Sequence, residues 1–109
     1  MALQFTYSVG GRAVWTGTAN TTLVVTGNSS VSNIASNVET VQSAIIKGIR
    51  FSSANNILIQ RNGATVAQLY GTDHWDNVEF IENATSNIVV TFNGNGTLHM
   101  ILHKTSQAL

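Results

Sequence analysis

The segment NILIQRNGATVAQLYG, residues 56–71, gives the clearest indication of how this chain folds. Two runs rich in apolar and β-branched residues flank Asn62-Gly63. This dipeptide favours a two-residue type I′ turn, because both central residues of that turn need positive φ. The segment therefore predicts a β-hairpin. The register expected from a two-residue loop pairs Arg61 with Ala64, Ile59 with Val66, and Leu58 with Ala67.

A second hairpin is expected from NIVVTFNGNGTLHMILHK, residues 87–104. A three-residue loop at 94–96 places six apolar side chains on one face, whereas a two-residue loop places Thr97, His99 and His103 there. Because a one-residue slip exchanges the two faces of a strand, burial favours the three-residue loop. The expected pairs are Phe92 with Leu98, Val90 with Met100, and Ile88 with Leu102.

Alternation of apolar and polar residues predicts further strands nearer the start of the chain. The expected strands cover residues 3–9, 12–18 and 21–26. The composition of GNSSVSN, residues 27–33, is typical of a loop. A short strand or an irregular segment is expected at 31–35.

Residues 33–51, NIASNVETVQSAIIKGIRF, fit two patterns. Apolar residues at 34, 38, 41 and 45 share one face of a helix, whereas the second half of the segment alternates as in a strand. The β-branched residues and Gly48 favour a long strand at 40–51. Residues 33–40 stay open between helix and strand.

These strands, with turn residues at intervals of about 8–12 residues, predict an all-β fold. We expect a single domain over residues 1–109, built as an antiparallel β-sandwich or a jelly-roll-like barrel of about eight strands. The sequence contains no proline, so every backbone N–H is free to pair in a sheet.

Charged residues are sparse: Asp, Glu, Lys and Arg make up 9% of the chain, against about 25% in typical domains. The five Lys and Arg residues are scattered along the sequence, and the formal net charge is zero. This pattern argues against a basic stripe and so against nucleic-acid binding. Thr, Ser and Asn supply 35 of the 109 residues. Such a surface tolerates close packing against a neighbour, because few charges need desolvating.

The segment GTDHWDNV, residues 71–78, holds the densest group of chemically active side chains. Asp73 and Asp76 could bind a hard cation, and His74 could act as a general base. However, the segment lacks the spacing of a cation-binding loop, and no set of nucleophile, base and orienting group can be named. We therefore predict a connecting loop in which Trp75 anchors on the core, with no catalytic residue, cofactor or metal site.

His99 and His103 stand four residues apart. On a helix that spacing can chelate zinc, but on a strand it separates two side chains by about 13 Å, which one metal ion cannot bridge. Because the segment follows a glycine-rich loop, we expect a strand that carries two partly exposed histidines flanking Ile101. Such histidines could face a partner subunit or respond to pH near about 6.5.

Four aromatic residues, Tyr7, Trp15, Tyr70 and Trp75, could form a platform for a sugar, although such rings more often pack in cores and interfaces. The residues expected at a partner interface are Trp15, Tyr70, His74, Trp75, His99, Ile101 and His103.

The chain as a whole resembles the small all-β structural proteins of tailed bacteriophage virions, especially capsid decoration (cement) proteins. The resemblance lies in the opening MALQFTYSVGG, in the low-charge body rich in Asn, Thr and Ser, and in IQRNGATVAQLYGTDHW, residues 59–75. It implies a non-enzymatic protein that clamps neighbouring subunits of the major capsid protein, often as a homotrimer, and it carries over no catalytic residue. The capsid-binding arm of such proteins is not identifiable, so the attachment mode stays open.

The resemblance also implies a place on the capsid surface of a virion assembled in the host cytoplasm. The chain has no apolar run of membrane-helix length and no signal-peptide pattern at its start, so no membrane partner is expected. Because it has no cysteine, no disulfide framework and no thiolate zinc site are expected either. The main alternative is a receptor- or glycan-binding module of a phage tail or fibre, and a small enzyme ranks last. A neutral docking surface predicts binding that depends weakly on salt.

Overall fold

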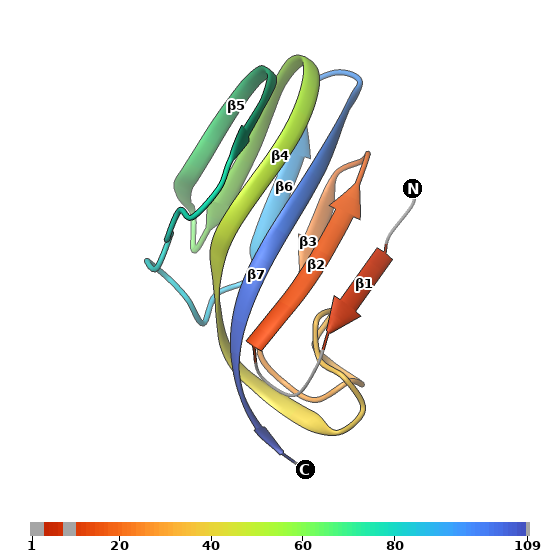
Figure 1. The fold of residues 1–109 in the computed structure, drawn as a ribbon, viewed down its shortest axis with the longest axis vertical. Helices are drawn as coiled ribbons and strands as arrows, with labels where there is room; N and C mark the ends of the chain where they lie inside the picture. Colours follow the sequence, from red (N-terminus) through yellow and green to blue (C-terminus); the bar gives the residue numbers. More distant parts are fainter. Residues whose placement is uncertain (1–3, 8–10, 109) are drawn as a thin grey trace.

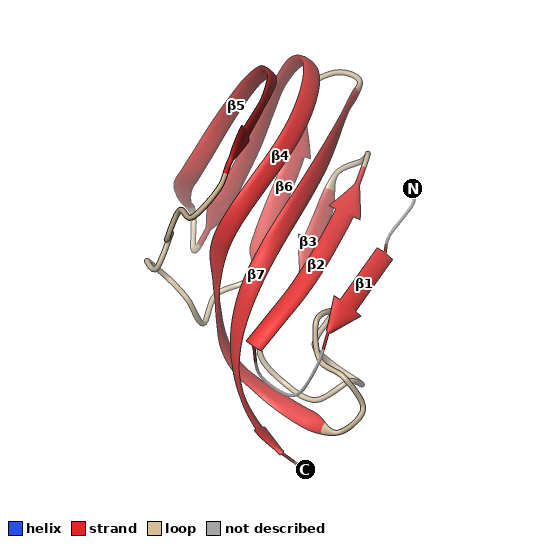
Figure 2. Cartoon of the chain, viewed as in Figure 1, coloured by secondary structure: helices blue, strands red, loops and turns tan. Residues whose placement is uncertain are grey.

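The computed structural model describes the backbone of residues 4–7 and the whole of residues 11–108 (Figure 1). All regular structure in this part of the chain is β-strand, which confirms the predicted all-β class (Figure 2). The strands are β1 (Gln4–Tyr7), β2 (Gly11–Gly17), β3 (Thr21–Leu23), β4 (Glu39–Arg61), β5 (Ala64–Trp75), β6 (Ile88–Phe92) and β7 (Gly96–Ala108).

The strands form one antiparallel sheet in the order β1-β2-β7-β4-β6-β3, with β5 paired to β4. The long strand β4 connects the two parts of the sheet. Its residues 39–53 pair with β7, and its residues 57–60 pair with β6. A register irregularity lies between Ser53 and Asn56, where β4 changes from one neighbour to the other. The sheet therefore curls around a single core, with β3 and β6 behind β2 and β7 in the view of Figure 1.

The core lies on the concave side of the curled sheet and receives alternate residues from almost every described strand. Trp15 from β2, Ile46 and Ile59 from β4, Leu69 from β5 and Met100 from β7 have no exposed surface. Each fully buried aliphatic side chain contributes about 1.5–3 kcal/mol relative to an exposed one. The period-two pattern that predicted these strands is thus the pattern that fills the core.

The predicted pairing of residues 87–104 is wrong, although the predicted buried face is largely correct. Strand β6 pairs with β3 and β4, and β7 pairs with β2 and β4, so Phe92–Leu98, Val90–Met100 and Ile88–Leu102 are not cross-strand pairs. The connecting segment crosses the bend of β4, where Asn93 N donates to Asn56 O and Ala54 N to Asn95 O, each at 2.9 Å. Five of the six side chains are buried from two parts of the sheet: Ile88, Val90, Leu98, Met100 and Leu102, with Phe92 half-buried.

The hairpin at residues 56–71 forms as predicted at its turn. Asn62 and Gly63 have φ of 51° and 75°, and Arg61 pairs with Ala64. Further along, the predicted register is wrong by one residue, because Val66 is an extra residue at a bulge. Ile59 lies opposite Ala67 rather than Val66, and Leu58 lies opposite Gln68 rather than Ala67. The bulge turns Ala67 and Leu69 toward the core and leaves Tyr70 exposed.

Residues 33–38 are irregular, and the strand expected at 40–51 begins at Glu39 and continues to Arg61. The runs at 40–51 and 56–61 form one strand, so the described residues make seven strands rather than the eight or nine expected. The strand expected at 21–26 is shorter and ends at Leu23. Part of the strand expected at 3–9 lies outside the described residues.

Two of the five basic residues are buried and tie loops to the sheet. Arg61 donates to Ala44 O (2.5 Å), Ala84 O (2.9 Å) and Ser86 O (2.7 Å). Burial lowers its pKa to about 10, which still leaves the guanidinium charged at neutral pH. This arrangement fixes the segment that leads into β6.

Lys104 forms the second buried anchor, through an ion pair with Glu39 in which neither side chain is exposed. Its Nζ also donates to Ile34 O at 3.2 Å, and Glu39 accepts from Ser36 N at 2.7 Å. The irregular segment before β4 is therefore held on β7. Since Arg61 and Lys104 point inward, only three Lys and Arg side chains reach the surface.

Candidate functional site

The outer face of the sheet carries a continuous row of polar side chains across four strands. Thr16 of β2 lies opposite His99 of β7. His99 lies opposite Arg50 of β4, and Arg50 lies opposite His74 of β5. The flanking residues in these strands are mostly buried in the core, so this row points to the other side of the sheet. The next row consists of Thr97, Ser52 and Thr72.

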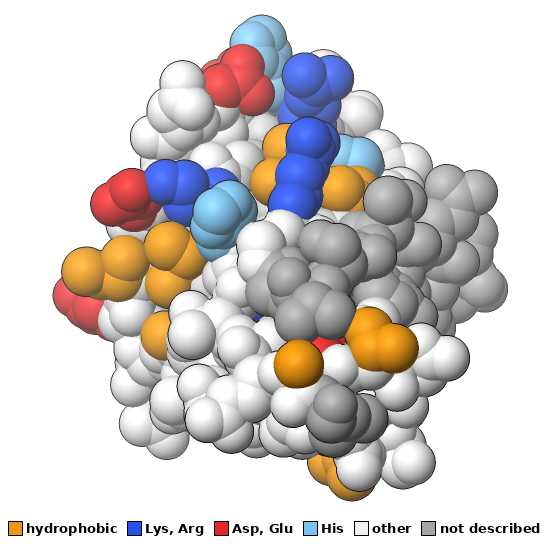
Figure 3. Space-filling view, turned by 60° about the horizontal axis from the view of Figure 1, so that its bottom comes forward, with side chains coloured by type: hydrophobic (Ala, Val, Ile, Leu, Met, Phe, Trp, Pro, Cys, Tyr) orange, Lys and Arg blue, Asp and Glu red, His pale blue; other side chains and the backbone are white. Residues whose placement is uncertain are grey.

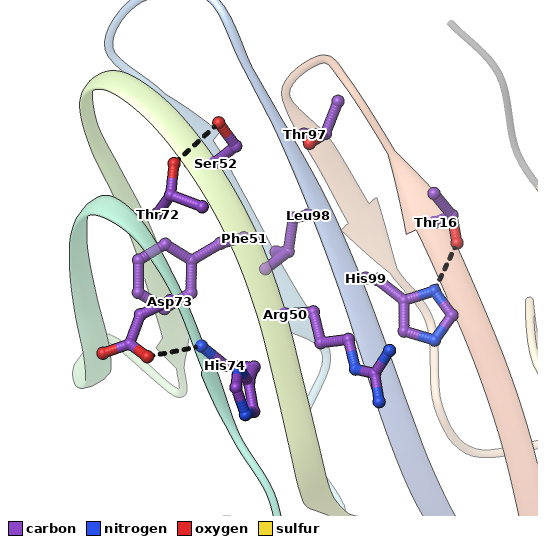
Figure 4. A pocket seen from close by; sticks show the side chains of 10 residues that line it. All are labelled: Thr16, Arg50, Phe51, Ser52, Thr72, Asp73, His74, Thr97, Leu98 and His99. Atoms are coloured by element: carbon purple, nitrogen blue, oxygen red, sulfur yellow. Dashed lines mark hydrogen bonds between the residues drawn. The ribbon is translucent and has the colours of Figure 1, made fainter.

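The two rows line an open hollow of about 450 Å³ (Figure 4). In Figure 4, Arg50 lies between His99 and His74, and the hydroxyl groups lie along one side of the hollow. Thr72 Oγ1 donates to Ser52 Oγ at 3.1 Å. Guanidinium, imidazole and hydroxyl groups can all donate hydrogen bonds, so this lining suits an acceptor-rich ligand.

His99 is the best-defined side chain of the hollow. Its Nδ1 lies 2.8 Å from Thr16 Oγ1, which holds the ring in place. Burial lowers the pKa of His99 below its ordinary value, and the positive charges of Arg50 and Arg12 lower it further. Burial and the two neighbouring guanidinium groups thus both favour the neutral imidazole.

All exposed Lys and Arg side chains and all three histidines lie on this side of the molecule. We call this surface the basic face and define it by Arg12, Thr16, Lys47, Arg50, His74, His99, Ile101 and His103. A second hollow of about 240 Å³, next to Ile101, includes Arg12, Lys47 and His103. In the space-filling view, cationic, imidazole and carboxylate side chains gather in the upper half, with hydrophobic side chains between them (Figure 3). The basic residues are thus scattered in the sequence but clustered in space.

Carboxylates also lie on the basic face, since Asp73 lines the first hollow and Asp76 lines the second. Lys47 Nζ contacts Glu79 Oε1 at 2.6 Å, which lowers the pKa of Glu79. His74 Nε2 lies 3.7 Å from Asp76 Oδ2. Within residues 11–108, neither Arg12 nor Arg50 forms an ion pair with a carboxylate. The two arginines therefore carry the positive charge of the face that no ion pair neutralises.

The segment 71–78 differs from the predicted loop, because its first part is the end of β5 and the irregular chain begins only at Asp76. Pairing with β4 holds it as a strand. Trp75 packs on the core as predicted, with its ring 5.8 Å from Phe51 and 6.4 Å from Phe80, centroid to centroid. Asp73 accepts a hydrogen bond from His74 N at 2.7 Å. No group of three or more potential metal ligands occurs in the described part of the chain.

Four of the seven expected interface residues lie on the basic face: His74, His99, Ile101 and His103. The expected strand at 97–104 is confirmed, and its two histidines flank Ile101 as predicted.

Of the four aromatic residues considered as a possible sugar platform, the structure describes the side chains of Trp15, Tyr70 and Trp75, and of these only Tyr70 is exposed. Trp15 has no exposed surface, because it alternates into the core of β2, so its assignment to a partner or sugar surface is wrong. Tyr70 is 63% exposed and accepts a hydrogen bond from Gln68 Nε2 at 3.0 Å. Trp75 is half-buried against the core. The side chain of Tyr7 lies outside the described part of the structure.

Sequence reasoning missed Arg12, Arg50 and the hydroxyl residues of the hollow. The signal for the arginines was present in the alternation: Arg12 precedes the inward residue Ala13, and Arg50 stands between the buried residues Ile49 and Phe51. What alternation cannot supply is the register that brings β2, β7, β4 and β5 together. Only that register places the two arginines near one another.

The Thr16–His99 contact resembles part of a catalytic dyad, in which a third group orients the base. Among the described residues, no carboxylate contacts the His99 ring, whose positive neighbours are arginines. The arrangement offers a ligand guanidinium, imidazole and hydroxyl groups.

No protein-family model, curated protein or solved structure matches this chain. Within the described residues, no helix is long and apolar enough to cross a membrane.

Proposed function

We propose that this protein is a non-enzymatic assembly protein that docks on a larger structure through the basic face. The observation that supports this most directly is the row of Thr16, His99, Arg50 and His74 across four strands. This row offers a broad and open surface with half-buried apolar residues beside it, Val14 and Ile101 among them. Such a combination of apolar centre and polar surroundings suits a protein partner.

The larger structure that we propose is the capsid of a tailed bacteriophage. The protein is then a decoration (cement) protein of the virion surface, assembled in the host cytoplasm, which stabilises contacts between major capsid subunits. The resemblance in composition and motifs supports this assignment. A curled all-β domain with one large open face is compatible with it, although fold alone does not define function.

We also propose that the protein forms a homo-oligomer, with a trimer as the expected state. We further propose that the domain is a jelly-roll-like sandwich of two layers. Among the described strands, β5 pairs only with β4, and β1 and β3 end the order of the sheet. Unpaired strand edges can accept a strand from a neighbouring copy. The bend of β4 near Ser53 supports the two-layer description, because β4 pairs with β7 before it and with β6 after it.

Co-sedimentation with undecorated phage capsids tests the proposed function. The expected result is saturable binding with a fixed number of copies per capsid. An Arg50→Gln variant should bind more weakly, whereas a Thr22→Gln variant, exposed on β3 and outside both hollows of the basic face, should bind like the parent chain.

The second candidate is a glycan-binding module of a tail or fibre, which the exposed ring of Tyr70 favours. In this case the protein fails to bind capsids and instead binds a host polysaccharide saturably. That binding should be lost in Tyr70→Ala and retained in Arg50→Gln.

A further inference from the structure

The structure assigns a chemical character to the partner of the basic face: we propose that this face binds a carboxylate-rich protein surface, with Arg50 as its central contact and Arg12 beside it. This inference deepens the proposed function, on which its capsid arm depends. The charges of the face define the chemistry of its partner, whether or not that partner is a capsid.

The exposed cationic side chains lie on one side of the molecule. The chain has five Lys and Arg residues and three histidines. Arg61 and Lys104 are buried and satisfied inside the fold, and the other six residues lie on one face. Asp76 and Glu79 lie on the same face beside His74 and Lys47, so the positive charge that no ion pair neutralises among the described residues is confined to Arg12 and Arg50. Such an arrangement favours an acidic contact at these two arginines.

Two of the exposed cations form no ion pair with a carboxylate of the described residues. Lys47 and His74 at the margin already have Glu79 and Asp76 as neighbours. Arg12 and Arg50 are exposed, and neither contacts a carboxylate in the described part of the chain. Arg50 lies opposite His99, and Arg12 lies opposite His103 on the same strand, β7. The unneutralised charge is thus local and directed outward.

A carboxylate is the ligand group that fits the hollow around Arg50. The planar guanidinium of Arg50 can bind a carboxylate through two parallel hydrogen bonds. Hydroxyl groups of Ser52, Thr72 and Thr97 line the same hollow and can donate to the remaining lone pairs (Figure 4). An Asp or Glu side chain from a partner surface reaches such an open hollow without any opening motion.

The basic face suits a protein partner better than other anionic partners. A nucleic acid presents a phosphate at every nucleotide and is bound by proteins with many basic contacts, whereas this face has two free arginines. A second copy that docks by the same face brings like charges together, which costs free energy. Half-buried Ile101 and Val14 beside the arginines add an apolar contact that suits a folded protein surface.

The decisive experiment is an NMR titration of the full chain with two probe peptides, hexaglutamate and hexalysine, in buffer of low ionic strength. We expect hexaglutamate to shift the amide signals of Arg50, His99 and Thr97, and hexalysine to leave them unchanged. Arg50→Gln should weaken hexaglutamate binding at least fivefold. The control Thr22→Gln changes an exposed residue of β3 that lines neither hollow of the basic face and should change binding less than twofold. Unchanged thermal unfolding of both variants shows that the fold is kept.

Several results overturn the inference. These are the absence of shifts with hexaglutamate, shifts centred on another surface, and equal losses in Arg50→Gln and Thr22→Gln. Sedimentation velocity supplies a further arm: self-association that disappears in Arg50→Gln assigns the face to a second copy instead.

Measurements of capsid binding distinguish the decoration function from the proposal of an anionic partner. Capsid binding that falls at least tenfold between 50 mM and 500 mM NaCl, roughly the range over which exposed charges become screened, and that depends on Arg50 supports both proposals. Capsid binding that is indifferent to salt and to Arg50 keeps the decoration function and overturns the anionic partner. Hexaglutamate binding at Arg50 without any capsid binding keeps the inference and overturns the decoration function.

Discussion

At the scale of single residues, the fold uses its cations in two different ways. Arg61 and Lys104 are inside and satisfy backbone carbonyls, whereas Arg12 and Arg50 are outside without a carboxylate partner in the described structure. The difference follows from position on alternating strands, since all four residues belong to strands. The sequence alone shows the alternation at Arg12 and Arg50. It does not show that Arg61 and Lys104 break the rule of polar outward and apolar inward, because their partners lie far away in the sequence.

Replacement of Arg61 tests the buried anchor. Arg61→Met removes the donors to Ala44 O, Ala84 O and Ser86 O, so these carbonyls lose their partner. We expect the free energy of unfolding to fall by about 2–5 kcal/mol, measured by urea denaturation. The control Arg12→Met changes an exposed residue and should shift the free energy by less than about 0.5 kcal/mol. Equal effects of the two substitutions contradict the anchoring role.

The pH dependence of stability tests the surroundings of His99. Burial, Arg50 and Arg12 hold its pKa below the ordinary value in the folded state. As pH falls, the unfolded chain therefore takes up the proton at this site before the folded protein does, and stability decreases. We expect acidification from pH 7.5 to pH 5.5 to reduce the free energy of unfolding more in the parent chain than in His99→Gln. The check is urea denaturation at both pH values, and an identical loss in the two proteins refutes the assignment.

At the scale of elements, alternation predicted which residues face the core more reliably than which strands pair. In β6 and β7 the buried face was largely predicted, but the two strands are separated by β4 in the sheet. A side chain enters the core from either part of a curled sheet, so burial does not identify the neighbour. The bulge at Val66 illustrates the same limit, since turn chemistry sets the register only as far as the first irregularity.

The two faces of β7 give a stability prediction for this element. Leu102 has no exposed surface, whereas its neighbour Ile101 is half-buried on the basic face. Leu102→Ala should cost about 2–5 kcal/mol, and Ile101→Ala clearly less, in matched denaturation experiments on the unbound protein. Similar large losses at both positions mean that a second layer or subunit covers the outer face.

At the scale of the whole molecule, the candidate site depends on non-local register and could be predicted only in part. Four residues of the face were predicted from their type and spacing: His74, His99, Ile101 and His103. The two arginines were regarded as scattered, because their positions in sequence do not reveal that β2 and β4 flank β7. Trp15 was misplaced for a simpler reason: a large amphipathic ring fits both a core and an interface, and its burial was decided by the curl of the sheet.

The arrangement of strands predicts how local stability is distributed. Residues 49–53 of β4 pair with β7 on one side and β5 on the other. The three-residue strand β3 pairs with β6 alone. Amide hydrogen exchange followed by NMR should therefore show slow exchange in this part of β4 and faster exchange in β3 and in residues 24–38. Comparable protection of β3 and β4 is inconsistent with the sheet order.

The central place of β7 has a consequence for synthesis on the ribosome. This strand follows all the other described strands in the chain, yet it lies between β2 and β4. Until residues 96–108 have emerged, β2 and the first half of β4 have no β7 to pair with, and their backbone N–H and C=O groups stay available to other nascent chains. The sheet therefore closes late, by contacts between residues far apart in sequence, which slows folding. Crowded polysomes carrying this message are the setting in which misassembly between copies should be most frequent.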